Sequence, residues 1–282
     1  MILDHRRCEL GEGPLWHPLR KQLFWFDITA NRLLASGDQL WQFTENVSAA
    51  GWTSYDELLI ASETALFRFD LTTGSRTDLV ALEPDNPRSR SNDGRADPQG
   101  GFWIGTMGKR GDSDPGMGSI WRYYRGELRR LYPNITITNA ICFTPDGRTA
   151  HFSDTMTGQV MRVNLDSSGW PTGMPEVYLD LKSQGLNPDG AVVDAVGNMW
   201  LAQWGASRVA CYAPDGTLLR AVSFDAPHTS CPAFGGPDLT TLFCTTALQH
   251  MTTTDRESHP NAGKTFAAEG IAKGQPEHQV IL

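Results

Sequence analysis

The chain has 282 residues, of which 40% are hydrophobic and 10% aromatic, and it contains 28 glycines and 17 prolines. This composition is typical of a globular protein with many short strands and tight turns, and it argues against disorder. The formal net charge of −8 and the lack of a long run of Lys and Arg exclude an electrostatic basis for nucleic-acid binding.

The compartment can be predicted from the cysteines and the N-terminus. The five cysteines are scattered, odd in number and without CxxC spacing, so we expect reduced core residues rather than disulfides or a zinc site. The charged N-terminus does not resemble a signal peptide, and no segment approaches the roughly 18 apolar residues of a membrane span. The sequence predicts one cytoplasmic domain over residues 1–282, with no membrane partner.

Short apolar runs separated by polar turns recur six times along the chain. The first copy has apolar runs within Leu15–Asp27 and at Arg32–Leu34, which indicates an antiparallel meander of short strands. The later copies predict strands at 51–52, 58–60 and 65–69, then 102–105 and 119–123, then 141–143, 151–154 and 160–163, then 191–193, 199–202 and 208–212, and finally 231–234 and 241–245.

The spacing of the copies matches one blade of a β-propeller. The first turn residues of the copies, which lie about 36 to 50 residues apart, are His17, Thr53, Asp97, Thr144, Asp194 and Gly235. A meander of this size cannot bury both faces alone, so the copies should stack radially. We therefore predict an all-β fold, a six-bladed β-propeller. The alternative, a repetitive β-sandwich, would give fewer copies with matching turns.

The chain ends carry weaker signals. A strand within Met1–Cys8 could pair with the last blade and close the ring. No stretch shows a long helical period, and Lys264–Ala272 is expected to form at most a short helix in a loop.

One polar position recurs immediately before the first strand of every copy. Counting back five residues from each turn residue gives Glu12, Ser48, Asn92, Asn139, Asp189 and Ser230. Because the innermost strands of a propeller start near its central axis, equivalent positions should converge on one small space. Asp189 by itself, in the turn-forming segment Asn187–Gly190, would be interpreted as an ordinary turn residue at the mouth of a buried strand.

Two acids and two carboxamides in this ring predict a metal ion at the axis. Clustered carboxylates repel one another, and their burial is costly unless a cation compensates. Their oxygen atoms suit Ca²⁺, Mg²⁺ or Mn²⁺, and Zn²⁺ or Fe²⁺ stay possible with carboxylate ligands. With few protein ligands, the ion would keep open positions for water and substrate, which favours hydrolysis of an ester-like bond. The alternative is a water-filled polar channel.

Several motifs together resemble one family. They are Gly11–Trp16, Arg90–Gly94, Asp97–Pro98, Gly105–Met107, Asn139, Phe152–Asp154, Pro188–Gly190, Asp194, Gly197–Trp200 and Cys231–Gly236. In this order and over nearly the whole chain, they are similar to those of the SMP-30/gluconolactonase/LRE family of regucalcin-like sugar lactonases. The resemblance implies a six-bladed propeller with one divalent metal ion and hydrolysis of a sugar-derived aldonolactone to the aldonic acid.

The resemblance also implies roles for individual residues. The metal ligands correspond to Glu12, Asn139 and Asp189, and the base corresponds to Asp189. The residues that bind the sugar hydroxyls correspond to Arg90 and Asn92; without the family, Arg90 would be interpreted as a surface charge.

A further family acid matches Asp114 only loosely, because the Gly-rich loop Lys109–Gly118 has a composition of its own. This loop suits either a mobile lid over the site or a plain solvated loop.

Two other functions remain open from the sequence. One is a related esterase or phosphotriesterase that uses the same metal ion on another leaving group. The other is a non-catalytic propeller that binds calcium or presents a protein-interaction surface. Of the seven histidines, none has metal-ligand spacing, and His151 is expected in the core.

Overall fold

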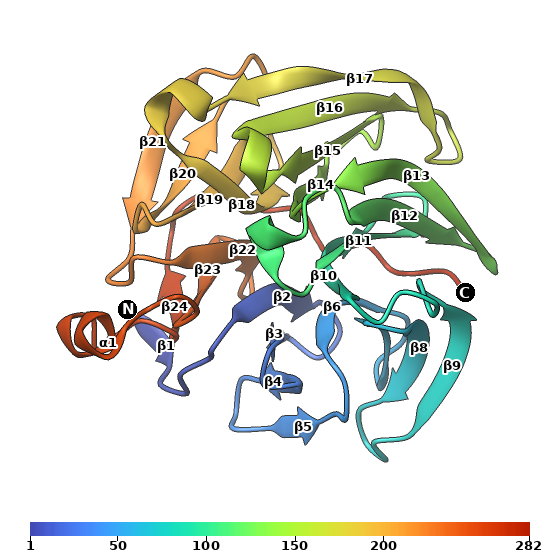
Figure 1. The fold of residues 1–282 in the computed structure, drawn as a ribbon, viewed down its shortest axis with the longest axis horizontal. Helices are drawn as coiled ribbons and strands as arrows, with labels where there is room; N and C mark the ends of the chain where they lie inside the picture. The colour runs from blue at the N-terminus through green and yellow to red at the C-terminus, as the bar shows by residue number, and fades with distance from the viewer.

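The computed structural model describes residues 1–282 and shows six four-stranded antiparallel sheets arranged around a central axis (Figure 1). The first blade consists of β2 (Gly11–His17), β3 (Gln22–Asp27), β4 (Arg32–Ala35) and β5 (Leu40–Gln42). The second consists of β6 (Val47–Trp52), β7 (Glu57–Ser62), β8 (Ala65–Asp70) and β9 (Arg76–Ala81). The third consists of β10 (Ser89–Ala96), β11 (Phe102–Gly108), β12 (Gly118–Tyr124) and β13 (Glu127–Ile135). The predicted six-bladed propeller is confirmed.

The remaining blades follow the same plan. The fourth consists of β14 (Thr138–Phe143), β15 (Thr149–Asp154), β16 (Gln159–Leu165) and β17 (Pro171–Asp180). The fifth consists of β18 (Asn187–Val193), β19 (Met199–Trp204), β20 (Arg208–Tyr212) and β21 (Leu218–Ser223). The sixth consists of β22 (Thr229–Gly235), β23 (Thr241–Thr246), β24 (Thr265–Ala268) and β1 (Ile2–Asp4).

The sixth blade joins the two ends of the chain. Strand β1 pairs antiparallel with β24, as expected for a strand within Met1–Cys8. The expectation for Lys264–Ala272 was wrong, because this segment contains β24 and not a helix. Phe266 pairs with Cys244 of β23 and is buried there, so pairing of the β23 edge outweighs local propensity.

Four short helices connect the strands. They are η1 (Gly111–Ser113), η2 (Thr155–Thr157), η3 (Lys182–Gln184) and α1 (Thr253–Ser258). The six-residue helix α1 is too short for a periodic pattern, but its capping box is visible in the sequence as Thr252 followed by Asp255. None of the helices has the length and apolar character needed to cross a membrane.

Burial decreases from the axis outward, which explains the apolar pattern of the copies. Every residue of the inner strand β14 is buried, whereas the outer strand β9 has no buried residue. Apolar clusters fill the space between neighbouring blades; the largest has 15 buried residues and includes Phe24 of the first blade and Phe67 of the second. All five cysteines are buried and free, as expected. His151 is also buried, and burial lowers its pKa to about 3.

A C-terminal segment, residues 274–281, closes the ring at the carboxyl ends of the inner strands. Its backbone donates hydrogen bonds from Gly274 to Leu239 O (2.8 Å) and from Val280 to Trp52 O (2.9 Å). The Gln275 side chain donates to Phe143 O (3.1 Å) and Val193 O (2.9 Å). In Figure 1 this red segment passes behind the ring. The segment therefore links blades that are far apart in the chain.

A buried ion pair fixes this segment at the axis. Glu277 binds Arg95 of β10, and the two side chains are only 7% and 10% exposed. Arg95 also donates to Ala191 O and Pro232 O of the fifth and sixth blades, both at 3.4 Å. Four parts of the chain thus meet at one guanidinium.

Replacing Glu277 should destabilise the protein strongly. Glu277→Ala leaves the Arg95 charge buried without its partner, which is expected to lower the free energy of unfolding by about 3–5 kcal/mol. Glu127→Ala is the control, because its pair with Arg129 is more than half exposed and contributes less than about 1 kcal/mol. Denaturant unfolding measures both variants, and equal effects would show that the segment is not anchored by this pair.

Candidate functional site

The six polar positions predicted from the repeat converge near the starts of the inner strands. All six side chains are buried, with exposed fractions between 0% and 5%. Contacts join them across blades: Ser48 Oγ donates to Ser91 Oγ (2.7 Å), and Asn92 Nδ2 donates to Asn139 Oδ1 (3.2 Å). Ser230 Oγ donates to Gly11 O, beside Glu12. The six positions are therefore buried at the same end of the inner strands, and one direct contact, from Asn92 to Asn139, joins two of them.

Irregular backbone aims these side chains at the axis. The register of every inner strand shifts at or next to the ring position, as between Ser91 and Gly94 in β10 and between Pro188 and Ala191 in β18. Such bulges interrupt the alternation of side chains between the two faces of a strand. Asn187–Gly190 is therefore not the expected turn; its turn-forming residues instead form a bulge within β18.

Two of the bulges contain left-handed backbone. Gly13 (φ 54°) follows Glu12, and Ala140 (φ 56°) follows Asn139. A Cβ at Gly13 would lie 2.3 Å from Ser48 O, so only glycine fits there. At Ala140 the conformation costs about 1–2 kcal/mol, which the surrounding blades must offset.

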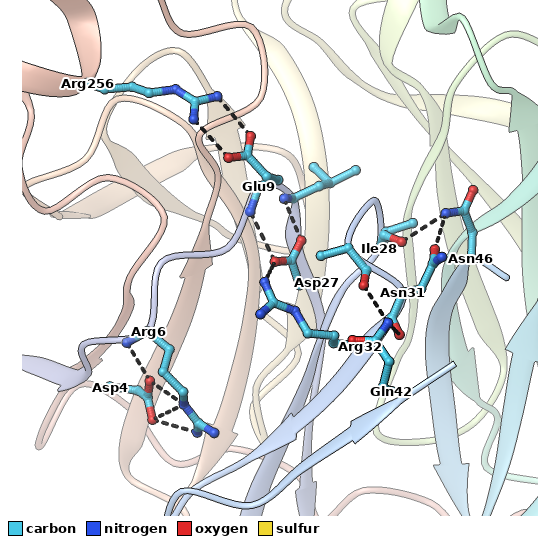
Figure 2. Close-up of polar contacts among 12 residues, drawn as sticks. Asp4, Arg6, Glu9, Asp27, Ile28, Asn31, Arg32, Gln42, Asn46 and Arg256 are labelled. Atoms are coloured by element: carbon cyan, nitrogen blue, oxygen red, sulfur yellow. Dashed lines mark hydrogen bonds and ion pairs between the residues drawn. The ribbon is translucent and has the colours of Figure 1, made fainter. Parts of the chain in front are cut away.

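Acids at the ends of second strands hold the starts of the inner strands. Asp27 accepts hydrogen bonds from the backbone N–H groups of Glu9 (3.2 Å) and Leu10 (3.0 Å) and pairs with Arg32 at 2.7 Å (Figure 2). In the fourth blade, Asp154 accepts in the same way from two backbone N–H groups, those of residues 136 and 137. In both blades a bonded N–H group lies two residues before a ring residue. These hydrogen bonds therefore fix the backbone that leads into Glu12 and Asn139.

A chain of hydrogen bonds links Asn92 and Asn139 to the backbone of Pro188. Asn139 Oδ1 accepts from Asn92, and Asn139 Nδ2 donates to Thr155 Oγ1 (2.8 Å). Thr155 Oγ1 in turn donates to Pro188 O (2.8 Å), next to Asp189. These bonds fix the orientation of the Asn139 amide so that its oxygen is on the side of Asn92.

Three buried acids share this space with one guanidinium. Burial, with the charge of Asp93, raises the pKa of Glu12 to about 8. Burial, with the charges of Glu12 and Asp93, raises the pKa of Asp189 well above its usual range. Burial also raises the pKa of Asp93 to about 6. The carboxylates thus repel one another in a buried region that solvates charge poorly.

Arg90 is the cation that faces these acids. It is only 5% exposed, so the structure does not support a surface charge. Burial lowers its pKa to about 10, while the charges of Glu12, Glu63 and Asp189 favour the charged form. Its Nη1 donates to Asn92 Oδ1 (2.7 Å) and Ser91 O (2.9 Å), which leaves Nε and Nη2 for a ligand.

The donor set fits a divalent cation that prefers oxygen. Glu12, Asp93 and Asp189 against Arg90 leave two uncompensated negative charges when all are ionised, which matches the charge of such an ion. No three side chains among His, Cys, Asp and Glu are placed to hold a metal. Two carboxylates therefore need an amide oxygen, such as that of Asn139, as a third ligand.

Asp93 was missed by the sequence reasoning, although it adjoins Asn92. Counting back from the turn residues selects one residue per blade, and in a regular strand the next side chain would point to the opposite face. The bulge between Ser91 and Gly94 removes this restriction. Asp93 Oδ2 also accepts from the backbone N–H of Ile141 (2.7 Å), which ties the third blade to the fourth.

Asp114 is not among the charges that act on Glu12 or Asp189. Its carboxylate binds the Arg110 side chain and the Arg110 backbone N–H (3.1 Å), within the loop Lys109–Gly118. In Figure 1 this loop, which carries η1 and is green, projects over the middle of the ring. A contact between Asp114 and a substrate stays a prediction.

Comparisons with known proteins support the fold and indicate a family. The sequence profile of the SMP-30/Gluconolactonase/LRE-like region matches residues 10–248. The chain is 41% identical to a putative sugar lactone lactonase of Rhizobium meliloti, over 98% of this chain and 95% of that one. It is 32% identical to L-arabinolactonase of Azospirillum brasilense, over 95% and 91% of the two chains. The crystal structure of a calcium-binding protein, regucalcin, from Agrobacterium tumefaciens superposes with a TM-score of 0.96 at 38% identity, over 100% and 97% of the chains.

The bridge through Thr155 gives a testable prediction. Thr155→Val removes the hydroxyl that joins Asn139 to Pro188, and it should lower the free energy of unfolding by about 1 kcal/mol. Thr157→Val, in the same short helix but exposed, should lower it less. Thermal unfolding of the two variants checks this, and an equal or larger loss for Thr157→Val would contradict it.

Proposed function

The chain belongs to the SMP-30/gluconolactonase/LRE-like family, and we propose that it is a divalent-metal-dependent lactonase that hydrolyses a sugar-derived aldonolactone to the aldonic acid. The Rhizobium and Azospirillum relatives are named for action on sugar lactones, which supports a hydrolase of carboxylic ester bonds. The observation that carries the proposal is the group of buried carboxylates facing Arg90 at the axis.

Glu12, Asn139 and Asp189 would hold the metal ion. Bound there, the ion supplies Lewis-acid polarisation of a carbonyl oxygen. Their oxygen atoms suit Ca²⁺, Mg²⁺ and Mn²⁺, while Zn²⁺ and Fe²⁺ also accept carboxylates. The Agrobacterium relative is described as calcium-binding, which makes Ca²⁺ the first ion to test.

Other steps of the reaction are assigned to individual side chains. Asp189 takes a proton from water as the water oxygen bonds to the lactone carbonyl carbon. The ring C–O bond then breaks, and the former ring oxygen becomes a hydroxyl by taking up a proton, which gives the open-chain acid. Arg90 and Asn92 hold the sugar hydroxyls, using the donors that Arg90 has free. Asp114 would add a further contact from the loop above.

A non-catalytic calcium-binding propeller is the second candidate. The description of the Agrobacterium relative as a calcium-binding protein favours it. The two candidates differ in one observable, because a binding protein would take up Ca²⁺ without opening any lactone. A related esterase or phosphotriesterase would instead act on acyclic esters or phosphotriesters.

Substitution of the acids should abolish lactone opening. Asp189→Ala removes the base and Glu12→Ala removes a ligand, so each should lower kcat/KM by at least about 10²–10⁴-fold while the protein stays folded. The assay follows acid release from five- and six-membered aldonolactones, with an aryl ester and a phosphotriester included, on metal-stripped and reconstituted protein. Asp146→Ala, at an exposed turn, is the control and should retain full activity.

The outcomes separate the candidates. Loss of turnover in both variants and in the metal-stripped protein supports the lactonase. Unchanged turnover of every active lactone in Asp189→Ala would rule out its role as the base. A wild-type protein that binds Ca²⁺ but opens no lactone would leave the binding propeller as the better account.

A further inference from the structure

Trp204 stands at a position where other blades have an acid. Ten residues after the turn residues of the first, second and fourth blades come Asp27, Glu63 and Asp154, and each accepts a hydrogen bond from the backbone at the start of an inner strand. In the fifth blade this position is Trp204. It cannot clamp the backbone in this way, so its large ring needs another explanation.

The register places Trp204 next to the start of β18, the strand that carries Asp189. At the end of β19, Trp204 pairs with Asn187 of β18, two residues before Asp189. Its side chain also packs against the apolar cluster that contains Leu10, two residues before Glu12. The indole therefore packs between the fifth and sixth blades, at the end of the inner strands that carries Asp189 and Ser230.

His228 supports the indole from one side. The rings of Trp204 and His228 are stacked, with centroids 4.2 Å apart and planes 10° apart. Burial lowers the pKa of His228, so the support is a neutral ring. Both residues are half-buried, so the indole is held in place but not enclosed.

The axial site would then have two unlike walls. Arg90 of the third blade has donors left at Nε and Nη2, and Asn92 Oδ1 beside it is an acceptor. Trp204, between the fifth and sixth blades, supplies an apolar aromatic surface. A sugar lactone has a matching division, because its hydroxyls project from the ring edge while ring C–H groups form an apolar face. Burial of that face against an indole is favourable.

We propose that Trp204, supported by His228, is a substrate-binding residue that stacks on the C–H face of the lactone ring. This role rests on the proposed lactonase function. Stacking holds the ring flat against the aromatic wall and directs its hydroxyls toward Arg90 and Asn92. It also selects for cyclic substrates, since an acyclic ester offers no comparable face.

Steady-state kinetics of three variants test this role, using the aldonolactone that the wild-type protein opens fastest. Trp204→Ala should raise KM about tenfold with kcat within about threefold, because stacking is made equally in the ground and transition states. Trp204→Phe, which keeps an aromatic face, should recover most of the loss. Trp16→Phe is the matched control, since Trp16 is also half-buried and stacked, on Phe243 at 5.7 Å, but lies near the opposite end of its inner strand.

A binding measurement separates stacking from a purely structural effect. Titration with the corresponding aldonate should change the tryptophan fluorescence of the wild-type protein and of Trp16→Phe, and the change should be lost in Trp204→Phe. An unchanged KM in Trp204→Ala, or an undiminished fluorescence change in Trp204→Phe, would overturn the role of Trp204. Lactone turnover by the wild-type protein would still support the lactonase in that case. Absence of wild-type turnover on all lactones would overturn both.

Discussion

The burial of Glu12, Asp93 and Asp189 around Arg90 is the constraint on which the site depends. Acids in a space that excludes water repel one another, and burial raises the pKa of each. The same fold with apolar residues in place of these three acids would be more stable, because the blades are held together by apolar packing. Under the proposed function, a divalent cation bound at the axis would offset this repulsion, and functional sites commonly carry such a loss of stability.

The propeller makes this arrangement possible by bringing six strand starts to one axis. No single blade could gather the acids, because Glu12, Asp93 and Asp189 come from three different blades. Bulges turn those side chains inward, acids such as Asp27 and Asp154 fix the strand starts, and residues 274–281 close the other end through the Arg95–Glu277 pair. The site is therefore positioned by contacts at both ends of the inner strands.

Much of the fold and part of the site could be predicted from the sequence. The recurring turn residues predicted the number and position of the blades. The position five residues before each turn grouped Glu12, Asn92, Asn139 and Asp189, because equivalent positions of a closed ring have equivalent geometry. The bulges recur in every inner strand but share no residue type, so Asp93 was missed and Asn187–Gly190 was taken for a turn. Strand β24 was also missed, because its pairing depends on the free edge of β23 rather than on its own composition.

The most direct test is the melting temperature of the metal-free protein at pH 7, with and without Ca²⁺ or Mn²⁺, for the wild type and Glu12→Gln. If repulsion among the acids is relieved by a bound cation, the ion raises Tm of the wild type. In the absence of the ion, Glu12→Gln then has a higher Tm than the wild type, and the ion raises its Tm by less. Glu127→Gln, which changes an exposed acid, behaves as the wild type. A wild-type Tm that no divalent ion changes, together with a lower Tm for Glu12→Gln, would contradict the account.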